Sequence, residues 1–383
     1  MPVLKTPPLS LYIHLPWCVQ KCPYCDFNSH RQPADQSYSK YIDALLADLR
    51  FESASVEGRA LVSIFIGGGT PSLFPADEVK RLLDAVSSLI ACSDGMEVTL
   101  EANPGTLEAG RYADYRKAGI NRLSIGVQSF SEKALQRLGR IHGPKEAIQA
   151  FHQAREAGFD NINLDLMYGL PAQTVAEAMF DVESAVGLAP EHISYYQLTI
   201  EPNTRFAATP PRLPSEEQLW DIQQKGQAML AAAGYRQYEI SAYSRANRQC
   251  RHNNNYWNFG DYLGIGAGAH GKISDRTAQR IRRRSRIRGP EAYMAAAGSP
   301  AALSGNHLLS EADLVVEFMM NLLRLSSGFT ETLFLDRTGL SYGRINPTLL
   351  QAQKRGLLRL QGTTILPTEL GHRYLNDLLA LFV

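Results

Sequence analysis

The sequence predicts an α/β fold with a parallel sheet or barrel, followed by a small winged-helix-like domain. First, six short runs rich in β-branched and apolar residues recur along residues 11–202. Second, amphipathic segments of helical length lie between these runs, and this alternation is typical of βα units with parallel strands. Third, the alternation stops at a Pro-rich break, RFAATPPRLP, after about residue 205. In such folds the active site gathers at the carboxyl ends of the strands.

Strands and helices of the first part follow from local spacing. The segment 77–90 predicts a helix because its apolar residues recur at helical spacing. The segment 144–158 predicts another, because Pro144 and Gly158 stand where helices begin and end. The six strands are expected at residues 11–15, 62–69, 97–104, 122–130, 161–171 and 192–202.

The remainder of the chain predicts a different organisation. A long helix is expected from Ser215 to Ala233, and another at 310–325 begins with a Ser310/Asp313 capping pattern. A helix at 345–356 with only two basic residues, two short strands joined at Gly362 and a last helix complete a winged-helix-like domain that we expect to pack rather than to bind nucleic acid. The expected parts are a barrel over 1–205, a barrel extension and connecting region over 206–305, and the winged-helix-like domain over 306–383.

Composition and charge exclude several classes of protein. The chain has 383 residues, of which 44% are hydrophobic and 20% charged, and its formal net charge is +1. These values exclude a collagen, a disordered chain and a disulfide scaffold, and they provide no general attraction to nucleic acid. No apolar run is long enough for a signal peptide or a membrane span. We therefore expect a cytoplasmic protein with no integral membrane segment and no nucleic-acid partner.

Three of the five cysteines form a cluster directly after the first predicted strand. Cys18, Cys22 and Cys25 have the spacing C-x3-C-x2-C, which in a reducing compartment indicates metal ligation or redox chemistry. Three thiolates are too few for a closed zinc site. On an iron–sulfur cluster they leave one iron open, and S-adenosylmethionine can chelate such an iron. Three unrelated thiols are the disfavoured alternative; Cys92 and Cys250 stand alone and are expected to be ordinary buried thiols.

These cysteines, followed by an aromatic residue and then by GGGTP at 67–71, resemble the radical S-adenosylmethionine (radical SAM) enzymes. Along nearly the whole chain the sequence is similar to the coproporphyrinogen oxidase-like family of that superfamily. The resemblance implies a partial (β/α)6 barrel with a winged-helix-like C-terminal domain, and a 4Fe-4S cluster on Cys18, Cys22 and Cys25. The other motifs that carry it are YIHLPWC (12–18), E-x-N-P (101–104), S-x-G-V-Q-S (124–129), LGR-x-H (138–142) and D-x-x-x-G-LP (165–171).

The resemblance also implies which residues bind S-adenosylmethionine. Gly68, Gly69 and Thr70 would line its methionyl end, where glycines let backbone amides approach the ligand. The forked donors of Arg140 suit a carboxylate, and Asp165 suits a ribose hydroxyl. Taken singly, each polar residue could instead be a helix cap or a surface pair. The set lies at or beyond strand ends and comprises Tyr12, Gly68, Gly69, Thr70, Glu101, Gln128, Arg140 and Asp165, with Thr199 as a looser candidate.

Two departures from the family's dehydrogenases disfavour decarboxylation of coproporphyrinogen. Phe27 stands where those enzymes carry a further cysteine, and only 17 residues precede the cysteine motif where they have a longer N-terminal segment. The cofactor site is not affected by either departure.

A second motif points to heme. HNNNYW at 252–257 fits the H-N-x-x-Y-W pattern of the heme chaperone branch. In that interpretation His252 could ligate heme iron, and Tyr256 and Trp257 could contact the porphyrin; the alternative is a packing cluster. His270, at the end of GIGAGAH, is a second candidate or part of a tight glycine turn.

An arginine-rich segment, QRIRRRSRIRG, predicts a strand with one solvated basic face. The alternative is that some of its guanidinium groups pair with porphyrin propionates or with an acidic partner. The arginines are Arg280, Arg282, Arg283, Arg284, Arg286 and Arg288.

Two functions from different classes remain. The favoured one is a heme chaperone that holds a 4Fe-4S cluster and S-adenosylmethionine and passes heme to an acceptor protein, without coproporphyrinogen dehydrogenase activity. The alternative is an oxygen-independent coproporphyrinogen III dehydrogenase that decarboxylates propionates, and a radical enzyme with an unrelated substrate is a third. The expected partners are heme, an acceptor protein and an electron donor for the cluster, with a homodimer as a further possibility.

Overall fold

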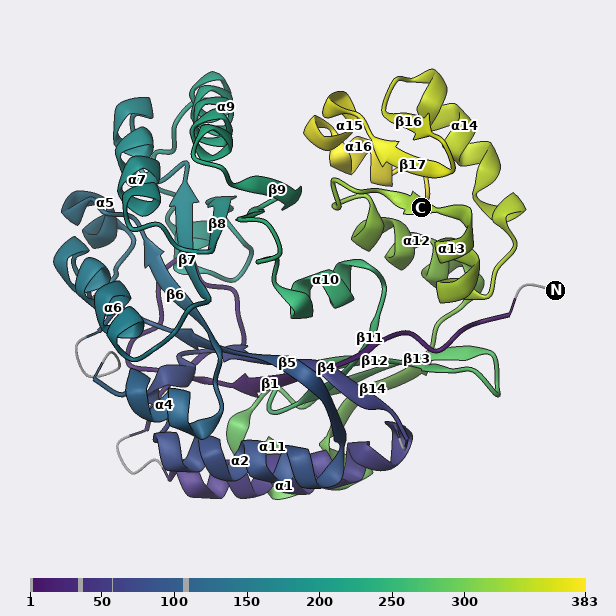
Figure 1. Cartoon of the computed structure of the whole chain (residues 1–383), viewed down its shortest axis with the longest axis horizontal. Coiled ribbons are helices and arrows are strands. Elements are labelled where there is room, and N and C mark those ends of the chain that lie inside the picture. The colour runs from purple at the N-terminus through teal and green to yellow at the C-terminus, as the bar shows by residue number, and fades with distance from the viewer. Residues whose placement is uncertain (1–2, 34–36, 57, 106–109) are drawn as a thin grey trace.

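One large sheet runs through the molecule, and helices pack along its outer face (Figure 1). The computed structural model describes residues 3–33, 37–56, 58–105 and 110–383. Over these residues the sheet has twelve strands in the order β14-β13-β12-β11-β1-β4-β5-β6-β7-β8-β10-β9. They are β1 (Leu9–Leu15), β4 (Ala60–Gly68), β5 (Ala91–Ala102), β6 (Arg122–Gln128), β7 (Ile162–Tyr168), β8 (His192–Gln197), β9 (Arg236–Glu239), β10 (Ala242–Ser244), β11 (Asp261–Ile265), β12 (His270–Asp275), β13 (Arg280–Arg286) and β14 (Leu303–Leu308).

The six strands that the sequence predicts form the centre of this sheet. β1, β4, β5, β6, β7 and β8 are consecutive neighbours, and each neighbouring pair is parallel. Their carboxyl ends therefore meet along one edge. In the part of the chain that the structure describes, the two outer strands β14 and β9 do not pair with each other. The expectation of an α/β fold built on a partial, unclosed barrel is confirmed.

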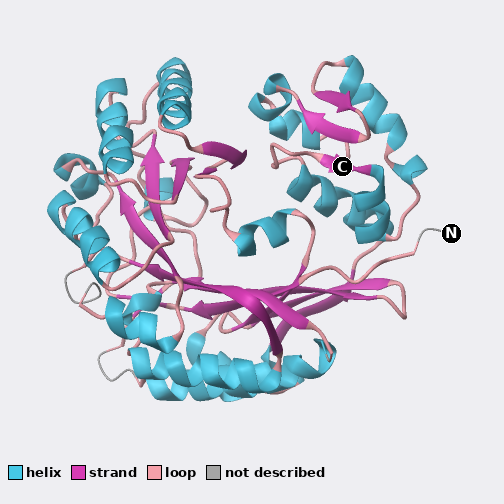
Figure 2. Ribbon diagram, viewed as in Figure 1, coloured by secondary structure: helices cyan, strands magenta, loops and turns pink. Residues whose placement is uncertain are grey.

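Helices follow the parallel strands and cover their outer face (Figure 2). The two helices predicted from spacing are present as α2 and α6, and α2 buries the apolar stripe that predicted it, including Val79, Leu82 and Val86. Burying each such side chain stabilises the fold by roughly 1.5 to 3 kcal/mol. The helices of this part are α1 (Tyr38–Ser53), α2 (Ala76–Leu89), α4 (Tyr112–Ala118), α5 (Glu132–Arg137), α6 (Pro144–Glu156), α7 (Val175–Gly187), α8 (Arg205–Ala208), α9 (Glu216–Ala232), α10 (Arg251–Trp257) and α11 (Pro290–Ala296).

Strands within residues 206–305 extend the sheet at both edges, and the sequence patterns predict only β13 among them. β9 and β10 add antiparallel strands beside β8, and β11 pairs in parallel with β1. β11 has no polar and apolar alternation because it is buried along its whole length. Gly264 in β11 lies so close to the next strand that a Cβ atom there would stand 1.9 Å from the carbonyl oxygen of His270.

The arginine-rich strand is confirmed as β13, but the expectation of one solvated basic face is wrong. Helices cover both faces of the strand: Arg283 pairs with Glu317 of α12, while Arg284 and Arg286 pair with Glu52 of α1. Arg286 is fully buried. A strand whose two faces are both covered must pair its buried charges with carboxylates of the chain itself.

The C-terminal residues supply most of a second, smaller core. This buried apolar cluster includes Phe318, Phe334 and Leu378, and Leu4, Phe259 and Ile281 from the rest of the chain join it. The expected last helix is divided at Tyr374 into two short helices, and Arg373 stacks on Trp220 of α9. The elements are α12 (Glu311–Leu322), β15 (Phe329–Thr330), α13 (Glu331–Thr338), α14 (Asn346–Lys354), β16 (Leu358–Gln361), β17 (Thr364–Pro367), α15 (Glu369–Arg373) and α16 (Leu375–Leu379).

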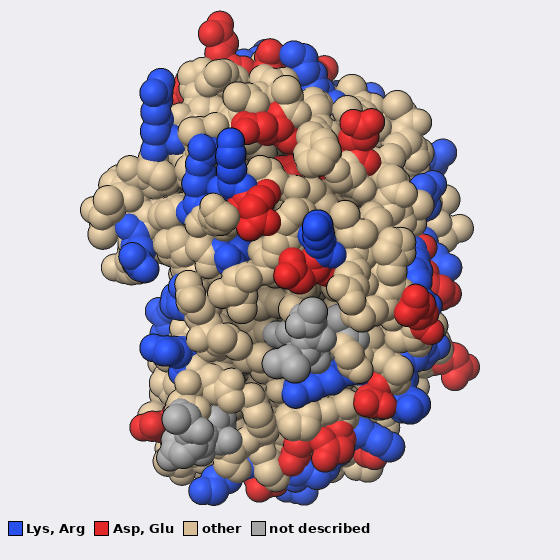
Figure 3. Space-filling view, turned by 90° about the vertical axis from the view of Figure 1, so that its left-hand side faces the viewer, with Lys and Arg blue, Asp and Glu red and all other residues tan. Residues whose placement is uncertain are grey.

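One face of the molecule has mixed charge, and the helices in the described ranges include no long apolar span. On the face shown in Figure 3, Lys and Arg side chains are interspersed with Asp and Glu, with no extended field of one sign. Of the helices in the described ranges, none is long and apolar enough to cross a membrane.

Candidate functional site

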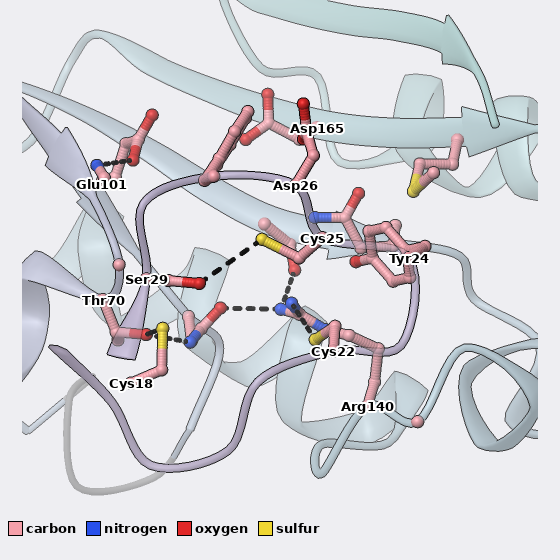
Figure 4. Close-up of a pocket in the computed structure, with 18 of the residues that line it drawn as sticks. Cys18, Cys22, Tyr24, Cys25, Asp26, Ser29, Thr70, Glu101, Arg140 and Asp165 are labelled. Atoms are coloured by element: carbon pink, nitrogen blue, oxygen red, sulfur yellow. Dashed lines mark hydrogen bonds between the residues drawn. The ribbon is translucent and has the colours of Figure 1, made fainter. Parts of the chain in front are cut away.

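A cavity of about 400 Å³ lies at the carboxyl ends of the parallel strands, and the three clustered cysteines lie in its wall (Figure 4). We call this region the mouth of the barrel. Its lining residues come from the cysteine loop after β1 and from the ends of β4 to β8. Of the residues proposed from the resemblance, it brings together Cys18, Cys22, Cys25, Gly68, Gly69, Thr70, Glu101, Gln128, Arg140, Asp165 and Thr199.

The cysteine loop leaves the end of β1 and is fixed at both ends by backbone contacts. Two-residue strands β2 (Trp17–Cys18) and β3 (His30–Arg31) pair with each other and close its base. Asn28 then ties the loop to the segments that follow β11, the neighbour of β1, and β13, because its side-chain amide donates to the carbonyl oxygens of Ala267 and Arg288 at 2.9 Å each. These contacts hold the loop in its shape.

Polar side chains lie close to each cysteine sulfur. The Thr70 hydroxyl donates to Cys18 Sγ at 3.4 Å, an Arg140 Nη1 donates to Cys22 Sγ at 3.7 Å, and the Ser29 hydroxyl lies 3.6 Å from Cys25 Sγ. All three cysteines are free thiols and partly exposed. Burial raises the pKa of Cys18, and the hydrogen bond from Thr70 partly opposes that shift.

The spacing of these thiols bears on what they can hold. Within the described ranges, no three His, Cys, Asp or Glu side chains lie close enough together to hold one metal ion. Three thiols that face one cavity without converging on one point fit a polynuclear cluster, in which each thiolate binds a different iron. The three cysteines therefore suit an iron–sulfur cluster better than a single metal ion.

Two carboxylates face the cavity from neighbouring parts of the sheet. Glu101 ends β5 and accepts a hydrogen bond from the backbone N–H of Gly68 at 3.1 Å. Asp165 lies on β7 and accepts hydrogen bonds from Asn163 and Ser124. Burial, reinforced by the charge of Asp165, raises the pKa of Glu101 to about 7, and burial also raises the pKa of Asp165. Such carboxylates are suited to a cationic ligand or to one that donates hydrogen bonds.

The glycine turn after β4 brings backbone close to the cysteine loop. At Gly69 a Cβ atom would stand 2.6 Å from the carbonyl oxygen of Trp17, and Gly68 has a φ of +116° with His14 directly behind it. The backbone N–H of Thr70 donates to Trp17 at 2.8 Å. Only glycine fits both positions, so the turn and the cysteine loop form one wall of the cavity.

Arg140 and Gln128 complete the polar wall. An Arg140 Nη2 donates to Asn103 Oδ1 at 2.7 Å and to the carbonyl oxygen of Gly126 at 2.9 Å. The Gln128 side chain accepts a hydrogen bond from the Tyr196 hydroxyl at 2.8 Å. Gln128 has a positive φ of 68°, which a residue with a side chain rarely adopts.

Tyr12 and His252 do not line this cavity. The Tyr12 hydroxyl pairs with His14 Nδ1 at 3.0 Å, and the Tyr12 ring lies 6.3 Å from that of His252, measured between centroids. The His252 ring is also 5.1 Å from that of Phe65, and its Nδ1 is 3.4 Å from the Ser63 hydroxyl. These rings lie inside the barrel, beside β1 and β4.

The helix α10, which carries HNNNYW, closes the barrel at the end away from the mouth, a region that we call the floor. Glu97 Oε1 accepts hydrogen bonds from the backbone N–H groups of Arg251 and His252. The Sγ atom of Cys250, a fully buried thiol, lies 3.5 Å from the same oxygen. Burial, reinforced by the Arg122 charge, lowers the pKa of His252 to about 3. His252 is therefore a neutral imidazole, but a buried one.

The other candidates of the heme motif lie apart. Tyr256 packs edge-on against Trp257 and beside Tyr262, and Arg324 of the C-terminal domain stacks on Trp257. His270 is exposed at the start of β12 and does not line the cavity. Tyr256 and Trp257 thus lie in a packing cluster, as the alternative interpretation expects. Heme contact by His252 stays a prediction.

Several residues of the mouth are absent from the sequence-based set. Asn103 and Ser124 belong to motifs that were recognised, so their motif membership was an available signal. Tyr24 and Tyr196 had no signal, because a tyrosine near a cysteine or in a strand most often packs in the core. Both hydroxyls are brought to the cavity only by the folding of the sheet.

The sequence and the fold place the chain in one superfamily. The sequence model of the Radical SAM superfamily matches residues 12–183, and that of the HemN C-terminal domain matches residues 309–374. The structure is similar to that of coproporphyrinogen III oxidase (HemN) from Escherichia coli, described as a radical SAM enzyme, with a TM-score of 0.82, 24% identity and coverage of 98% of this chain and 90% of that one. At that identity the likeness shows the fold.

Two relatives show to which branch of the superfamily the chain belongs. Heme chaperone HemW of Escherichia coli strain K12 is 48% identical over the whole of both chains, and heme chaperone HemW of Haemophilus influenzae is 49% identical over 99% of both. The chain belongs to the HemW branch of the radical SAM superfamily.

Proposed function

We propose that this chain is a heme chaperone, which binds heme and passes it to an acceptor protein. The observation that carries the proposal is the identity of 48% and 49%, over essentially the whole chain, to proteins named heme chaperone. The geometry adds a site at the mouth of the barrel that is suited to an iron–sulfur cluster. Heme is cargo in this proposal, and the cluster and S-adenosylmethionine are the resident cofactors.

The cluster would be held by Cys18, Cys22 and Cys25. The chain gives each of these thiols a hydroxyl or guanidinium group within hydrogen-bonding distance of its sulfur. A bound 4Fe-4S cluster supplies one electron at a time. Iron and sulfide assays after anaerobic reconstitution test this part, and we expect about four of each per chain.

The rest of the mouth would bind S-adenosylmethionine. Its ammonium and sulfonium charges and its ribose hydroxyls match the carboxyl groups of Glu101 and Asp165, and its carboxylate matches Arg140. The glycine turn offers backbone close to the cysteine loop. In this proposal Gly68, Gly69, Thr70 and Gln128 contact the ligand directly, and Tyr12 acts from behind the wall.

Heme has two possible positions, and the structure gives a reason for each. The prediction from the sequence is ligation by His252, which is neutral but packed between Tyr12 and Phe65, so ligation requires α10 to move. The mouth offers exposed apolar surface instead, because Val19, Phe27 and Ile141 on its rim are 50%, 60% and 64% exposed. Large apolar side chains exposed together mark binding surfaces.

An anaerobic heme titration of reconstituted protein, followed by Soret absorbance, tests the function and separates the two positions. Stoichiometric binding that coproporphyrinogen does not displace supports the chaperone. Loss of affinity in His252→Ala assigns heme to α10, whereas loss in Phe27→Ser with His252→Ala unaffected assigns it to the mouth. The exposed Phe180→Ser is the matched control, because Phe180 is 54% exposed but lies on α7 outside the cavity.

Two outcomes of the titration would contradict the chaperone. Absence of saturable heme binding overturns it outright. Displacement of heme by coproporphyrinogen, with release of carbon dioxide, favours the alternative dehydrogenase, whose further cysteine is replaced by Phe27 here. The solved neighbour that carries that name supports only the fold.

The remaining partners belong to the same proposal. A reductant that donates single electrons to the cluster, an acceptor protein for heme and a homodimer are each expected from it. A cytoplasmic location is expected because a reducing compartment keeps the cluster thiols free. Size-exclusion chromatography of the reconstituted protein tests the dimer directly.

A further inference from the structure

The end of β6 carries an irregularity that points Gln128 into the cavity. Ile125 pairs with Leu164 of β7, but the next pair is Gln128 with Leu166, so β6 has one residue more than β7 across this step. This is a β-bulge, a feature that commonly re-aims a side chain beside a binding site. Gln128 itself has a φ of 68°.

Two carbonyl oxygens within the bulged step of β6 accept hydrogen bonds from side chains of one short segment after α5. The carbonyl oxygen of Gly126 accepts a hydrogen bond from Arg140 Nη2 at 2.9 Å. That of Val127 accepts from His142 Nε2 at 3.1 Å, and also from the backbone N–H of Ser129 at 2.9 Å. The last bond closes a three-residue turn around Gln128, a γ-turn with positive φ, which is a strained conformation.

Neighbouring contacts hold the chain on both sides of this turn. Gly126 makes room for it, since a Cβ atom there would stand 3.0 Å from Gln128 Nε2. After the turn, the Asp181 carboxylate accepts hydrogen bonds from the Ser129 hydroxyl and from the Phe130 backbone N–H. His142 holds the turn itself through the Val127 carbonyl oxygen and does not line the cavity.

His142 has the properties of a fixed donor. It is buried, it does not line the cavity, and its Nε2 must carry the proton because its partner is a carbonyl oxygen. Burial, reinforced by the charge of Arg140, lowers the pKa of His142 to about 4. The bond to the Val127 carbonyl oxygen is the hydrogen bond that joins His142 to the bulged end of β6.

We propose that His142 is a positioning residue for the cofactor cavity: its hydrogen bond to the Val127 carbonyl oxygen holds the strained turn that presents Gln128 to the ligand. The proposal rests on the proposed function, in which that ligand is S-adenosylmethionine. Arg140, two residues earlier, donates to the adjacent carbonyl oxygen of Gly126 and itself lines the cavity. The short segment 140–142 therefore holds two consecutive carbonyl groups of the bulge.

Two measurements on three variants test the proposal. Equilibrium dialysis of S-adenosylmethionine on reconstituted protein gives the Kd, and hydrogen exchange of the peptide spanning 122–131 in cofactor-free protein reports the turn itself. His142→Ala removes the donor, His142→Gln retains an amide N–H of similar reach, and His152→Ala is the control, because His152 is exposed on α6 away from the cavity.

In His142→Ala we expect the Kd to rise roughly tenfold, as for other residues that orient a ligand-binding group, with iron content unchanged and faster exchange of the peptide. His142→Gln restores the Kd to within about threefold of wild type, and His152→Ala changes neither quantity. An unchanged Kd with unchanged exchange in His142→Ala overturns the proposal.

The test also covers a His142→Ala protein that does not fold and a wild-type protein that does not bind the cofactor. If His142→Ala does not fold, His142→Gln is compared with His142→Asn, whose amide is one methylene shorter; equal affinities overturn the proposal. If wild-type protein does not bind S-adenosylmethionine, the proposed function fails, while the exchange measurement still decides whether His142 holds the turn.

Discussion

The mouth and the floor of the barrel use the same strands and similar residues for different ends. β5 carries Glu101 at the mouth and Glu97 at the floor, and β7 carries Asp165 and Asn163 in the same order. Residues two or four apart on a strand share a face, at about 6 to 7 Å for each two residues. At the mouth the carboxylates border a cavity, whereas at the floor Glu97 caps α10. What covers a layer of polar groups thus decides whether it binds a ligand or stabilises the fold.

The buried polar groups of the mouth and of the floor differ in how well they are paired. The carboxylates of the mouth have raised pKa values because burial outweighs the hydrogen bonds that they accept and, at Asp165, the charge of Arg122. At the floor, Glu97 accepts two backbone hydrogen bonds, and His192 bridges Asn163 and the Tyr238 hydroxyl at 2.6 and 2.8 Å. Changes at the mouth should therefore alter ligand binding, and changes at the floor should alter stability.

The largest expected effect is at the mouth. Cys22→Ala should remove nearly all iron and sulfide from anaerobically reconstituted protein, because two thiolates cannot hold the cluster. The free energy of unfolding should change little, since Cys22 is partly exposed. Cys92→Ala is the control, as Cys92 lies on β5 outside the cavity. A Cys22→Ala protein that retains wild-type iron would contradict the assignment of the cluster.

At the floor the expected loss is one of stability. Glu97→Ala leaves the first amides of α10 without acceptors and takes a carboxylate from beside the buried Arg122, which should lower the free energy of unfolding by about 3 kcal/mol. Urea unfolding measures this, with Glu156→Ala on the exposed face of α6 as the control. Unchanged stability together with lost iron would instead show that Glu97 contributes to cluster binding at the mouth.

A smaller effect with the opposite sign is expected at Glu101. Its folded-state pKa of about 7 exceeds its ordinary value of 4.5, so the folded state binds this proton more tightly than the unfolded state does. Stability from this group is therefore present below pH 4.5 and is lost as pH rises toward 7. Ionisation should cost roughly 1 to 2 kcal/mol, allowing for exposure to the cavity.

Glu101→Gln should remove that pH dependence while it retains an acceptor for the Gly68 N–H. Cofactor-free variant should be more stable than wild type at pH 8 and equally stable near pH 4.5, and it should bind S-adenosylmethionine more weakly. Thermal unfolding at both pH values and equilibrium dialysis measure these results. Identical pH profiles for the two proteins would show that Glu101 is not the titrating group.

The smallest effect is expected at Tyr12, which lies between the two regions. Tyr12→Phe removes one hydrogen bond to His14 and should cost about 1 kcal/mol of stability, with the Kd of S-adenosylmethionine within about twofold of wild type. Tyr374→Phe, at an exposed tyrosine, is the control. A tenfold rise in Kd would place Tyr12 at the mouth, as the family resemblance implies.

Much of the mouth could be predicted from local sequence, while the floor could not. The C-x3-C-x2-C spacing predicts metal or redox chemistry because it places three thiols within eight residues, whereas the role of the GGGT turn follows from the family resemblance. A motif of six residues predicts His252 as a heme ligand, but the structure packs its ring beside that of Tyr12. The arginine-rich strand shows the same difficulty: its alternation predicts a strand, but the carboxylates that pair with it lie far away in the sequence.

Local spacing was sufficient for the six parallel strands, the flanking helices, the cysteine site and the family. This is so because hydrophobic periodicity, helix capping and close ligand spacing are all properties of neighbouring residues. The tertiary structure alone decided which polar layer stays open, that β11 joins β1, and that His142 holds the turn at Gln128. These features depend on contacts between residues distant in the chain, and on burial, which no short stretch of sequence encodes.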